Sequence, residues 1–379
     1  MHALVIGGTG PTGPFIVNGL LARGWKVEIL HTGNHEVDEI PPEVVHIHVS
    51  PHDPVALAAA VGDRKWDLCI ATYGRLRSIA EIFAGRVGRF ISVGGGPGYL
   101  GYMNPFLHQP EGIPGPLAED SPKVSDPAQD EKGWRIVRTE AAVFHYHPDA
   151  THFRYPFVYG PYQPAPREWM VVRRVLDGRR RIILPDGGLT LDAYGYAGNI
   201  AHAILLAVDQ PEQARGEIFN VADSHALSLR DVVFHAARAL DWEFEIIDIP
   251  APLALPALPL LTRPTTTHRL YDITKLRTRL GYRDAVAPAE AVASTARWLA
   301  AHPPPPVNGY PVEAVLQDPF DYAAEDQLIE RWQRALTTVE MPVWSTPPGY
   351  GMAYSGPGGR PRSKAVFEEA PLAGRSGQS

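Results

Sequence analysis

The stretch that decides the fold is ALVIGGTGPTG, residues 3–13, in which an apolar run leads directly into glycines at every third position. Residues 3–6 predict a strand, and a helix is predicted from about residue 13 to residue 23. Gly7 permits a tight turn, Gly10 lets a ligand approach the backbone, and Gly13 lets helix and strand pack closely. Such a turn presents backbone N–H groups at a helix N-terminus, which suits a pyrophosphate. The stretch therefore predicts a dinucleotide-binding strand–turn–helix unit.

Outward from this turn, strand-like and helix-like segments alternate. Further strands are predicted at residues 26–30, 44–49, 67–71, 89–93 and 152–155, with helices at residues 53–61, 78–84 and 134–145. This rhythm is typical of parallel strands joined by right-handed helical crossovers. The predicted fold class is α/β, with a doubly wound parallel Rossmann sheet and a smaller C-terminal substrate domain.

The second half of the chain predicts the domain organisation. A Gly/Pro-rich loop without a clear period, residues 94–132, is long enough to suggest a functional role. Later helices are predicted at residues 168–176, 199–208, 229–240, 288–300 and 323–336, strands at 181–184, 218–221 and 243–249, and a linker at 250–264. We expect an NAD(P)-binding Rossmann domain over residues 1–165. A mixed substrate-binding domain with late Rossmann elements is expected over 166–341, and a disordered Gly/Pro-rich tail over 342–379.

Composition excludes several function classes. The chain has 379 residues, of which 45% are hydrophobic and 20% charged, as in an ordinary soluble protein. Its formal net charge of −7 argues against a nucleic-acid partner. No run of about 18 apolar residues predicts a membrane span, and the start lacks the features of a signal peptide. Cys69 is the only cysteine, so we expect no disulfide and a cytoplasmic location.

Three motifs together resemble a known family. The turn GGTGPTG, the segment RYPFVYGP at residues 154–161 and the segment YDITKLRTRLGY at residues 271–282 are similar to the extended short-chain dehydrogenase/reductases. This group contains NAD-dependent nucleotide-sugar epimerases and dehydratases. The resemblance covers about residues 1–300 and implies a cofactor at the carboxyl edge of the sheet.

The second strand decides between NAD and NADP. An acid at its end would bind the ribose hydroxyls, and an arginine would favour a 2′-phosphate. The sequence there is Leu30-His-Thr-Gly33, and the absence of an acid favours NADP slightly. Asp53 is either an adenine contact, as the resemblance implies, or simply a helix N-cap. The residues expected at the cofactor are Gly7, Gly10, Thr12, Gly13, His31, Asp53, Arg138 and Pro156.

The catalytic pattern of the family is broken. The resemblance implies Tyr-x-x-x-Lys on the helix after the long loop, with the tyrosine exchanging a proton with substrate. Here the aligned positions are Trp134 and Arg138. Indole cannot exchange that proton, whereas Arg138 can still contact the nicotinamide ribose. Ser92 lies too early to be the family's third member.

Two explanations of this break stay open. The proton donor has moved to another tyrosine, either Tyr99 or Tyr102 in the long loop or Tyr73 after the fourth strand. In that case Arg138 is the expected charge that lowers the phenol's pKa. Tyr102 is favoured over Tyr99, because the glycines at 94–98 need length before the chain turns back over the cofactor. Alternatively, the protein binds the cofactor without turning it over.

Arginines gather near the start of the second domain. They are Arg167, Arg173, Arg174, Arg179, Arg180 and Arg181. They are either a clamp for substrate phosphates, with Arg167 and Arg173 as the expected contacts, or a solvated basic helix. Arg263 resembles the family's arginine for the substrate nucleotide.

No metal site is expected. His46 and His48 alternate on a strand, and His145 and His147 end a helix. Neither pair has a third or fourth ligand at a suitable spacing. A hydrolase is not supported either, because no G-x-S-x-G occurs.

The sequence therefore predicts an NAD(P)-dependent reductase, epimerase or dehydratase acting on a small-molecule or nucleotide-linked substrate, with catalytic Tyr102, Tyr99 and Arg138. The alternative is a non-catalytic NAD(P)-binding regulatory or sensor protein. A homodimer is also expected.

Overall fold

The computed structural model describes residues 1–261, 263, 265–307 and 309–345. The chain divides into two compact units, Met1–Asp326 and Gln327–Ser379. Helix α13 (Tyr322–Thr337) continues into the second unit. The tail expected to be disordered, 342–379, lies outside the described residues from residue 346 on. The domain limits expected at residues 165 and 341 stay predictions.

The main sheet has seven strands, all parallel, in the order β10-β6-β5-β4-β1-β2-β3. The strands are β1 (His2–Ile6), β2 (Lys26–His31), β3 (Val45–His48), β4 (Trp66–Ala71), β5 (Val87–Gly95), β6 (Thr151–Tyr155) and β10 (Ile218–Asn220). The order reverses beside β1, so the carboxyl end of β1 lies at the switch point where doubly wound sheets bind ligands. The α/β prediction with a parallel Rossmann sheet is confirmed.

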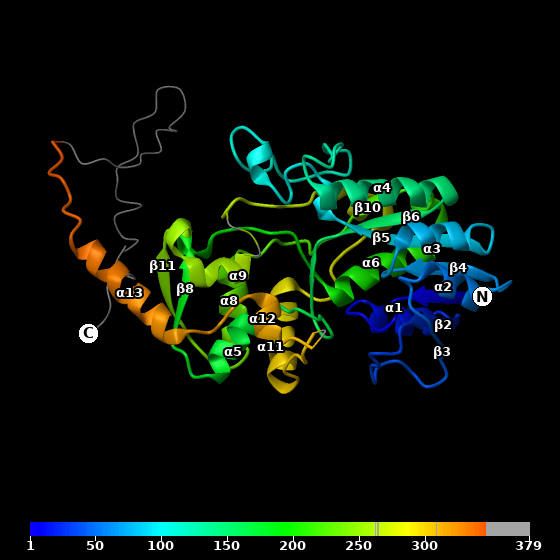
Figure 1. Ribbon diagram of the computed structural model, residues 1–379, viewed down its shortest axis with the longest axis horizontal. Helices are drawn as coiled ribbons and strands as arrows, with labels where there is room; N and C mark the ends of the chain where they lie inside the picture. The colour runs from blue at the N-terminus through cyan, green and yellow to red at the C-terminus, as the bar shows by residue number, and fades with distance from the viewer. Residues whose placement is uncertain (262, 264, 308, 346–379) are drawn as a thin grey trace, which may run out of the picture. The chain divides into compact units, whose positions relative to one another are not determined.

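Helices cover both faces of this sheet, as Figure 1 shows. One face carries α1 (Gly13–Leu21) and α6 (Ala197–Asp209), and the other carries α2 (Pro54–Val61), α3 (Leu76–Phe83) and α4 (Glu131–Tyr146). Strand β1 shows why the sheet is buried on both sides. Its residues Ala3 and Val5 join the core under α1 and α6, whereas Leu4 and Ile6 join the core under α2, α3 and α4. A continuous apolar strand of this kind is typical of a parallel sheet.

A second core gathers elements from the later part of the first unit. Two small parallel sheets pair β7 (Phe157–Tyr159) with β9 (Tyr194–Tyr196) and β8 (Arg181–Pro185) with β11 (Glu245–Ile249). Their apolar residues pack with α5 (Trp169–Leu176), α8 (Leu229–Arg238) and α11 (Pro288–Ala301). The remaining helices are short: α7 (Pro211–Ala214), α9 (Leu258–Leu261), α10 (Thr274–Leu280) and α12 (Val312–Leu316).

The sequence prediction missed some of these elements. Strands β7 and β9 have only three residues each, too few for an alternating pattern to be visible. The stretch expected as a linker contains the 3₁₀ turns Ala251–Leu253 and Leu255–Ala257 and helix α9. None of the described helices combines the length and apolar content needed to span a bilayer.

Candidate dinucleotide and substrate site

The glycine turn joins β1 to α1 at the switch point of the sheet. The Gly7 N–H donates to Leu30 O at the end of β2, and the Gly13 N–H donates to Gly10 O at 2.8 Å. Helix α1 then begins with Thr12 as its N-cap, but the Thr12 side chain makes no capping hydrogen bond and the first turn holds no acidic residue. The Gly13 N–H is thus engaged within the turn and Pro14 has no N–H, so a phosphate here would have to use other backbone amides between residues 8 and 15.

The glycines of this turn are needed for different reasons. Gly7 has φ +89°, and a Cβ on it would lie 2.7 Å from atoms of Thr72 and Tyr73. A Cβ on Gly13 would lie 2.1 Å from Gly8 O, so helix and strand pack too closely for a side chain there. For Gly10 the nearest atom to such a Cβ is Gly7 O at 3.5 Å, an ordinary contact. The protein itself therefore gives no steric reason for glycine at position 10.

The other residues expected at the cofactor lie at the same edge of the sheet or just beyond it. Thr12 is buried, with its hydroxyl 3.4 Å from the Tyr155 hydroxyl at the end of β6. Pro156 follows Tyr155 and lies against Gly195 of β9. Asp53 is the N-cap of α2, where its carboxylate accepts from the Val55 and Ala56 N–H groups. This geometry accounts for Asp53 without a ligand.

His31 ends β2 and is buried, 4% exposed. Its Nε2 lies 3.1 Å from Nδ1 of His46, and its Nδ1 faces the Gly33 N–H at 3.3 Å. Glu36 and His48 complete this group. The argument that His46 and His48 lack further ligands is therefore wrong, because strand pairing and the loop after β2 bring two more donors to them.

Trp134 and Arg138 lie one helical turn apart on α4. The Arg138 guanidinium lies over the Trp134 ring, 4.8 Å from its centroid. Arg138 is exposed and Trp134 half-buried. The expectation that Arg138 supplies the charge beside the catalytic tyrosine is wrong, since the charges that act on Tyr99 and Tyr102 are those of Arg154 and Arg269.

Tyr99 is buried in a polar network beneath the long loop. Its hydroxyl donates to Asn220 Oδ1 at 2.6 Å and accepts from Arg154 Nη1 at 2.7 Å. Arg154 in turn donates two hydrogen bonds to Glu140 of α4, each of 2.9 Å. Burial raises the pKa of Tyr99, although Arg154 opposes the shift. These contacts tie the long loop to α4, β6 and β10, and the Tyr99 hydroxyl is already engaged in them.

Tyr102 is also buried, at 6% exposure. It packs beside Tyr271 with Arg269 over its ring at 4.7 Å. A Cβ on Gly96 would lie 1.9 Å from the Tyr271 hydroxyl and 2.6 Å from the Tyr102 ring, so this glycine admits both rings. Burial raises the pKa of Tyr102 as well. A phenol poised for proton transfer by a lowered pKa is thus found at neither predicted tyrosine.

Ser92 and Tyr73 have different surroundings. The buried Ser92 hydroxyl lies 2.8 Å from Nδ1 of His152 inside the sheet. Tyr73 is 55% exposed, with its ring against that of His52 and its Cβ beside Gly7. Of the three tyrosines considered, Tyr73 alone combines an accessible ring with a place beside the glycine turn.

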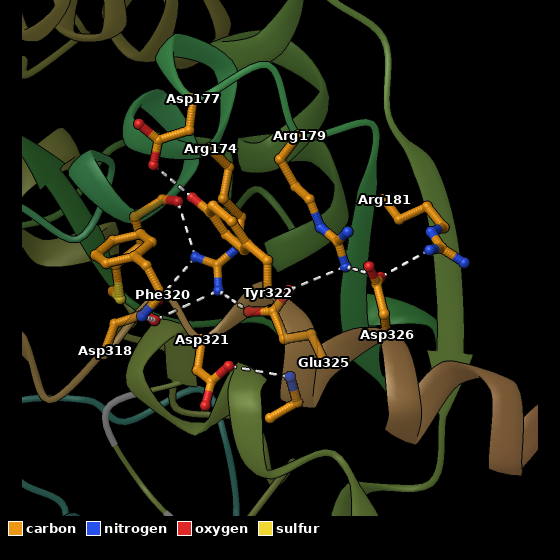
Figure 2. Close-up of polar contacts among 12 residues, drawn as sticks. Arg174, Asp177, Arg179, Arg181, Asp318, Phe320, Asp321, Tyr322, Glu325 and Asp326 are labelled. Carbon is orange, nitrogen blue, oxygen red and sulfur yellow. Dashed lines mark hydrogen bonds and ion pairs between the residues drawn. The ribbon is translucent and has the colours of Figure 1, made fainter.

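Most of the arginine cluster is engaged with carboxylates that come about 145 residues later. Figure 2 shows Arg174, Arg179 and Arg181 facing Asp318, Glu325 and Asp326. Arg174 is 2% exposed, with contacts of 2.7 Å to Asp318 and 2.5 Å to Glu325. The expected phosphate clamp is therefore wrong for Arg174, because two buried carboxylates already occupy its guanidinium.

Two of the three remaining members of this cluster are also paired or stacked. Arg173 contacts Asp177 at 2.8 Å and Glu313 at 3.0 Å, so the structure gives no support to its expected phosphate contact. The Arg180 guanidinium lies 3.5 Å from the centre of the Trp242 ring. These interactions are typical of arginines that stabilise a fold by pairing and stacking.

The last member of the cluster, Arg167, lies with Arg263 and Arg269 around Asp192. Arg263 and Arg269 contact its carboxylate at 2.6 and 2.8 Å. Arg167 is buried between the rings of Phe157 and Tyr194 and donates to Leu260 O. Burial lowers the pKa of Arg167 to about 10, despite the nearby carboxylates of Asp192 and Glu168. Arg269, whose partner Asp192 is far away in sequence, is a residue that the sequence analysis missed.

Part of the chain is similar in sequence to known proteins. Residues 138–222 match the model of the NAD dependent epimerase/dehydratase family. An uncharacterized protein of Sinorhizobium fredii, y4nL, is 29% identical over 166 residues, which are 38% of this chain and 46% of that protein. The match thus spans about half the length of this relative.

Solved structures share the fold. UDP-glucose 4-epimerase of Thermotoga maritima, solved with UDP-glucose, is 17% identical with a TM-score of 0.64, over 79% of this chain and 99% of that one. UDP-glucuronic acid 4-epimerase of Bacillus cereus, solved with UDP-glucuronic acid and NAD, is 16% identical with a TM-score of 0.61 over the same shares. The resemblance to the NAD-dependent epimerases and dehydratases among the extended short-chain dehydrogenase/reductases is confirmed.

Proposed function

We propose, from this resemblance, that the chain binds NAD(H) at the Gly7–Gly13 turn and acts as an oxidoreductase of the epimerase/dehydratase kind on a nucleotide-linked substrate. The cofactor is proposed as NAD because NAD is the dinucleotide named for the B. cereus neighbour. The earlier preference for NADP rested only on the absence of an acid after β2, and nothing in the comparisons supports it.

The observation that carries the proposal is the glycine at position 10. Neither φ nor the nearest protein atoms exclude a side chain there. The turn nevertheless lies at the uncapped N-terminus of α1, at the carboxyl end of a central strand. A ligand that needs the backbone at close range explains the glycine, and a pyrophosphate is the ligand that such a turn suits.

The residues of this chain are proposed mainly to bind and orient the cofactor, which supplies the hydride chemistry. The backbone of the glycine turn that leads into α1 would hold the pyrophosphate, and the bound nicotinamide would accept or give a hydride. Arg138, exposed on α4, is proposed to contact the nicotinamide ribose. Trp134 excludes the usual proton exchange at its position, because indole N–H does not titrate in this range.

The arginines around Asp192 support an anionic substrate. Arg167, Arg263 and Arg269 place three guanidinium groups near one another, and the pKa of Arg167 is lowered to about 10 by burial even with Asp192 and Glu168 nearby. A phosphate or diphosphate would add negative charge where guanidinium groups exceed carboxylates, with the forked geometry that arginine favours. This is the reason for preferring a nucleotide-linked substrate.

Titration with NADH tests the cofactor proposal. Gly10→Val should abolish the fluorescence response while the thermal midpoint stays close to that of wild type, because the protein has room for the Cβ. Ala22→Val, at the exposed end of the same helix, is the matched control and should bind as wild type does. Equal NADH affinity in wild type and Gly10→Val would contradict the proposed site.

A second candidate is a non-catalytic NAD(H)-binding protein. Trp134 at the family's tyrosine position favours it, as does the engagement of Tyr99 with Asn220 and Arg154. A panel of nucleotide-sugars separates the two candidates when wild type is compared with Tyr99→Phe and Tyr102→Phe. Epimerisation or hydride transfer by wild type would support the enzyme, and its loss in Tyr99→Phe or Tyr102→Phe would assign the proton donor. Tight NADH binding without turnover on the whole panel would favour the sensor.

The expected association of two copies stays a prediction, which sedimentation equilibrium would check.

A further inference from the structure

Three histidines and a glutamate converge at the outer edge of the main sheet. Strands β2 and β3 pair in parallel with His31 opposite His48, and His46 precedes His48 by two residues on the same face. Glu36 comes from the loop of residues 32–44 that joins the two strands. The register of β2 and β3 and the path of the loop between them bring four potential ligands to one place. No two of these ligands are closer than two residues in sequence.

Their potential ligand atoms are at coordination spacing. Glu36 carboxylate oxygens lie 3.7 Å from Nε2 of His31, 3.1 Å from Nδ1 of His46 and 3.2 Å from Nε2 of His48. His31 Nε2 and His46 Nδ1 are 3.1 Å apart, and all four atoms lie within 4.8 Å of one another. Ligands about 2.0–2.1 Å from a tetrahedral zinc are about 3.3–3.4 Å apart. The observed separations bracket that value.

Hydrogen bonding alone satisfies this arrangement poorly. The His31 and His46 nitrogens face each other and also face Glu36, so one shared proton can serve only one of these contacts. A cation among the four donors would satisfy all of them at once.

Gly33 makes the close approach of His48 feasible. It has φ +76°, and a Cβ on it would lie 3.2 Å from Cγ of the His48 ring. The loop therefore turns back over the histidines at a residue without a side chain. Coordination through His31 Nε2 would place a proton on Nδ1, opposite the Gly33 N–H. The weak contact between them, 3.3 Å long, would then be lost.

We propose that His31, Glu36, His46 and His48 form a binding site for one divalent transition-metal ion of the zinc class. Three imidazoles and one carboxylate suit zinc, whereas magnesium and calcium favour sites made of oxygen alone. The bound ion fastens the loop of residues 32–44 to β3, the four-residue edge strand of the sheet. The proposal does not depend on the proposed oxidoreductase activity, although His31 is also among the residues expected at the cofactor.

The test uses the untagged full-length chain after treatment with a chelator. Zinc is titrated against a chromophoric competitor, and metal retained after dialysis is counted by mass spectrometry. Wild type should bind one zinc ion per chain. Zinc should raise its thermal unfolding midpoint, and magnesium should leave that midpoint unchanged. Glu36→Gln and His48→Ala should weaken zinc binding at least about tenfold. Both residues are about half exposed, so the variants are expected to fold.

His145→Ala is the matched control, because His145 is an exposed histidine on α4 outside this group. It should bind zinc as wild type does. Circular dichroism on each metal-free variant confirms that the fold is kept. A wild type that retains no zinc overturns the proposal, and so do folded Glu36→Gln and His48→Ala variants with unchanged affinity.

Discussion

The buried pair Glu140–Arg154 predicts that the protein loses stability in acid. Arg154 donates two hydrogen bonds of 2.9 Å to the Glu140 carboxylate, and Lys123 donates a third of 3.1 Å. Burial alone would raise the pKa of Glu140, but the hydrogen bonds and charge of Arg154 outweigh it and hold that pKa at about 2, against an ordinary 4.5. Because one pKa unit is worth about 1.4 kcal/mol, the ionised pair contributes about 3 kcal/mol to folding.

The lowered pKa of Glu140 determines in which pH range the protein loses stability. The unfolded chain takes up a proton at Glu140 near pH 4.5, while the folded chain resists it down to about pH 2. The contribution is therefore complete above pH 4.5 and is lost as the pH falls toward 2.

His152, 3.8 Å from Glu140, extends the window upward. Burial lowers its pKa from 6.5 to about 4, so the unfolded chain binds this proton first and stability falls from pH 6.5 to 4.

The perturbation is Glu140→Gln, measured by urea unfolding from pH 7 to pH 3. At pH 7 it leaves the Arg154 charge buried without its carboxylate, which should lower the free energy of unfolding by about 3–5 kcal/mol. The matched control is Glu131→Gln on the same helix, where Glu131 is 66% exposed and pairs with an exposed arginine. That change should cost less than about 0.5 kcal/mol. A wild type equally stable at pH 7 and pH 3, or a Glu140→Gln variant as stable as the control, would refute the reasoning.

Three further outcomes are expected. Gly13→Val should destabilise the fold itself, unlike Gly10→Val, because its Cβ would lie 2.1 Å from Gly8 O; equal thermal midpoints for the two variants would contradict this. Arg174→Met should lower the free energy of unfolding by about 3–5 kcal/mol, because it removes the ion pair of buried Asp318 and the shorter of the two ion pairs of buried Glu325, while NADH affinity below the transition stays unchanged. Arg138→Ala should weaken NADH binding by about 1–3 kcal/mol, the range for a charge-assisted hydrogen bond, with no change in the unfolding midpoint; an unchanged Kd would remove Arg138 from the site.

What the sequence predicted well was local. The strand, glycine turn and helix at residues 3–23 carry their signal within a single window, so their position and the parallel sheet were predictable. Asp53 followed by proline predicts a helix start, and Asp53 caps α2 as that reading requires.

What the sequence predicted poorly depends on contacts between distant segments. The acids that occupy Arg174 and Arg179 lie about 145 residues later, so a basic segment looked free to hold phosphate. Tyr102 lies in a segment predicted as a loop and therefore looked accessible. In the structure Gly96 leaves room for its ring to pack beside Tyr271, a residue far along the chain.

The histidine group shows the same limit in a different form. Ligand spacing along the chain argued against a metal, because His46 and His48 have no partner within a few residues. The pairing of β2 with β3 sets His31 opposite His48, and this register is not visible in the spacing. A search for matched residues on neighbouring strand ends could have found it.

Amide hydrogen exchange with and without NADH tests the central claim most directly, because it locates the bound dinucleotide on the chain. The account predicts that saturating NADH slows exchange of amides within residues 7–16, at the turn and the uncapped start of α1. Exchange in α8 (Leu229–Arg238) should not change. Calorimetric binding of NADH with unaltered exchange in residues 7–16, or no binding at millimolar NADH, would contradict the account.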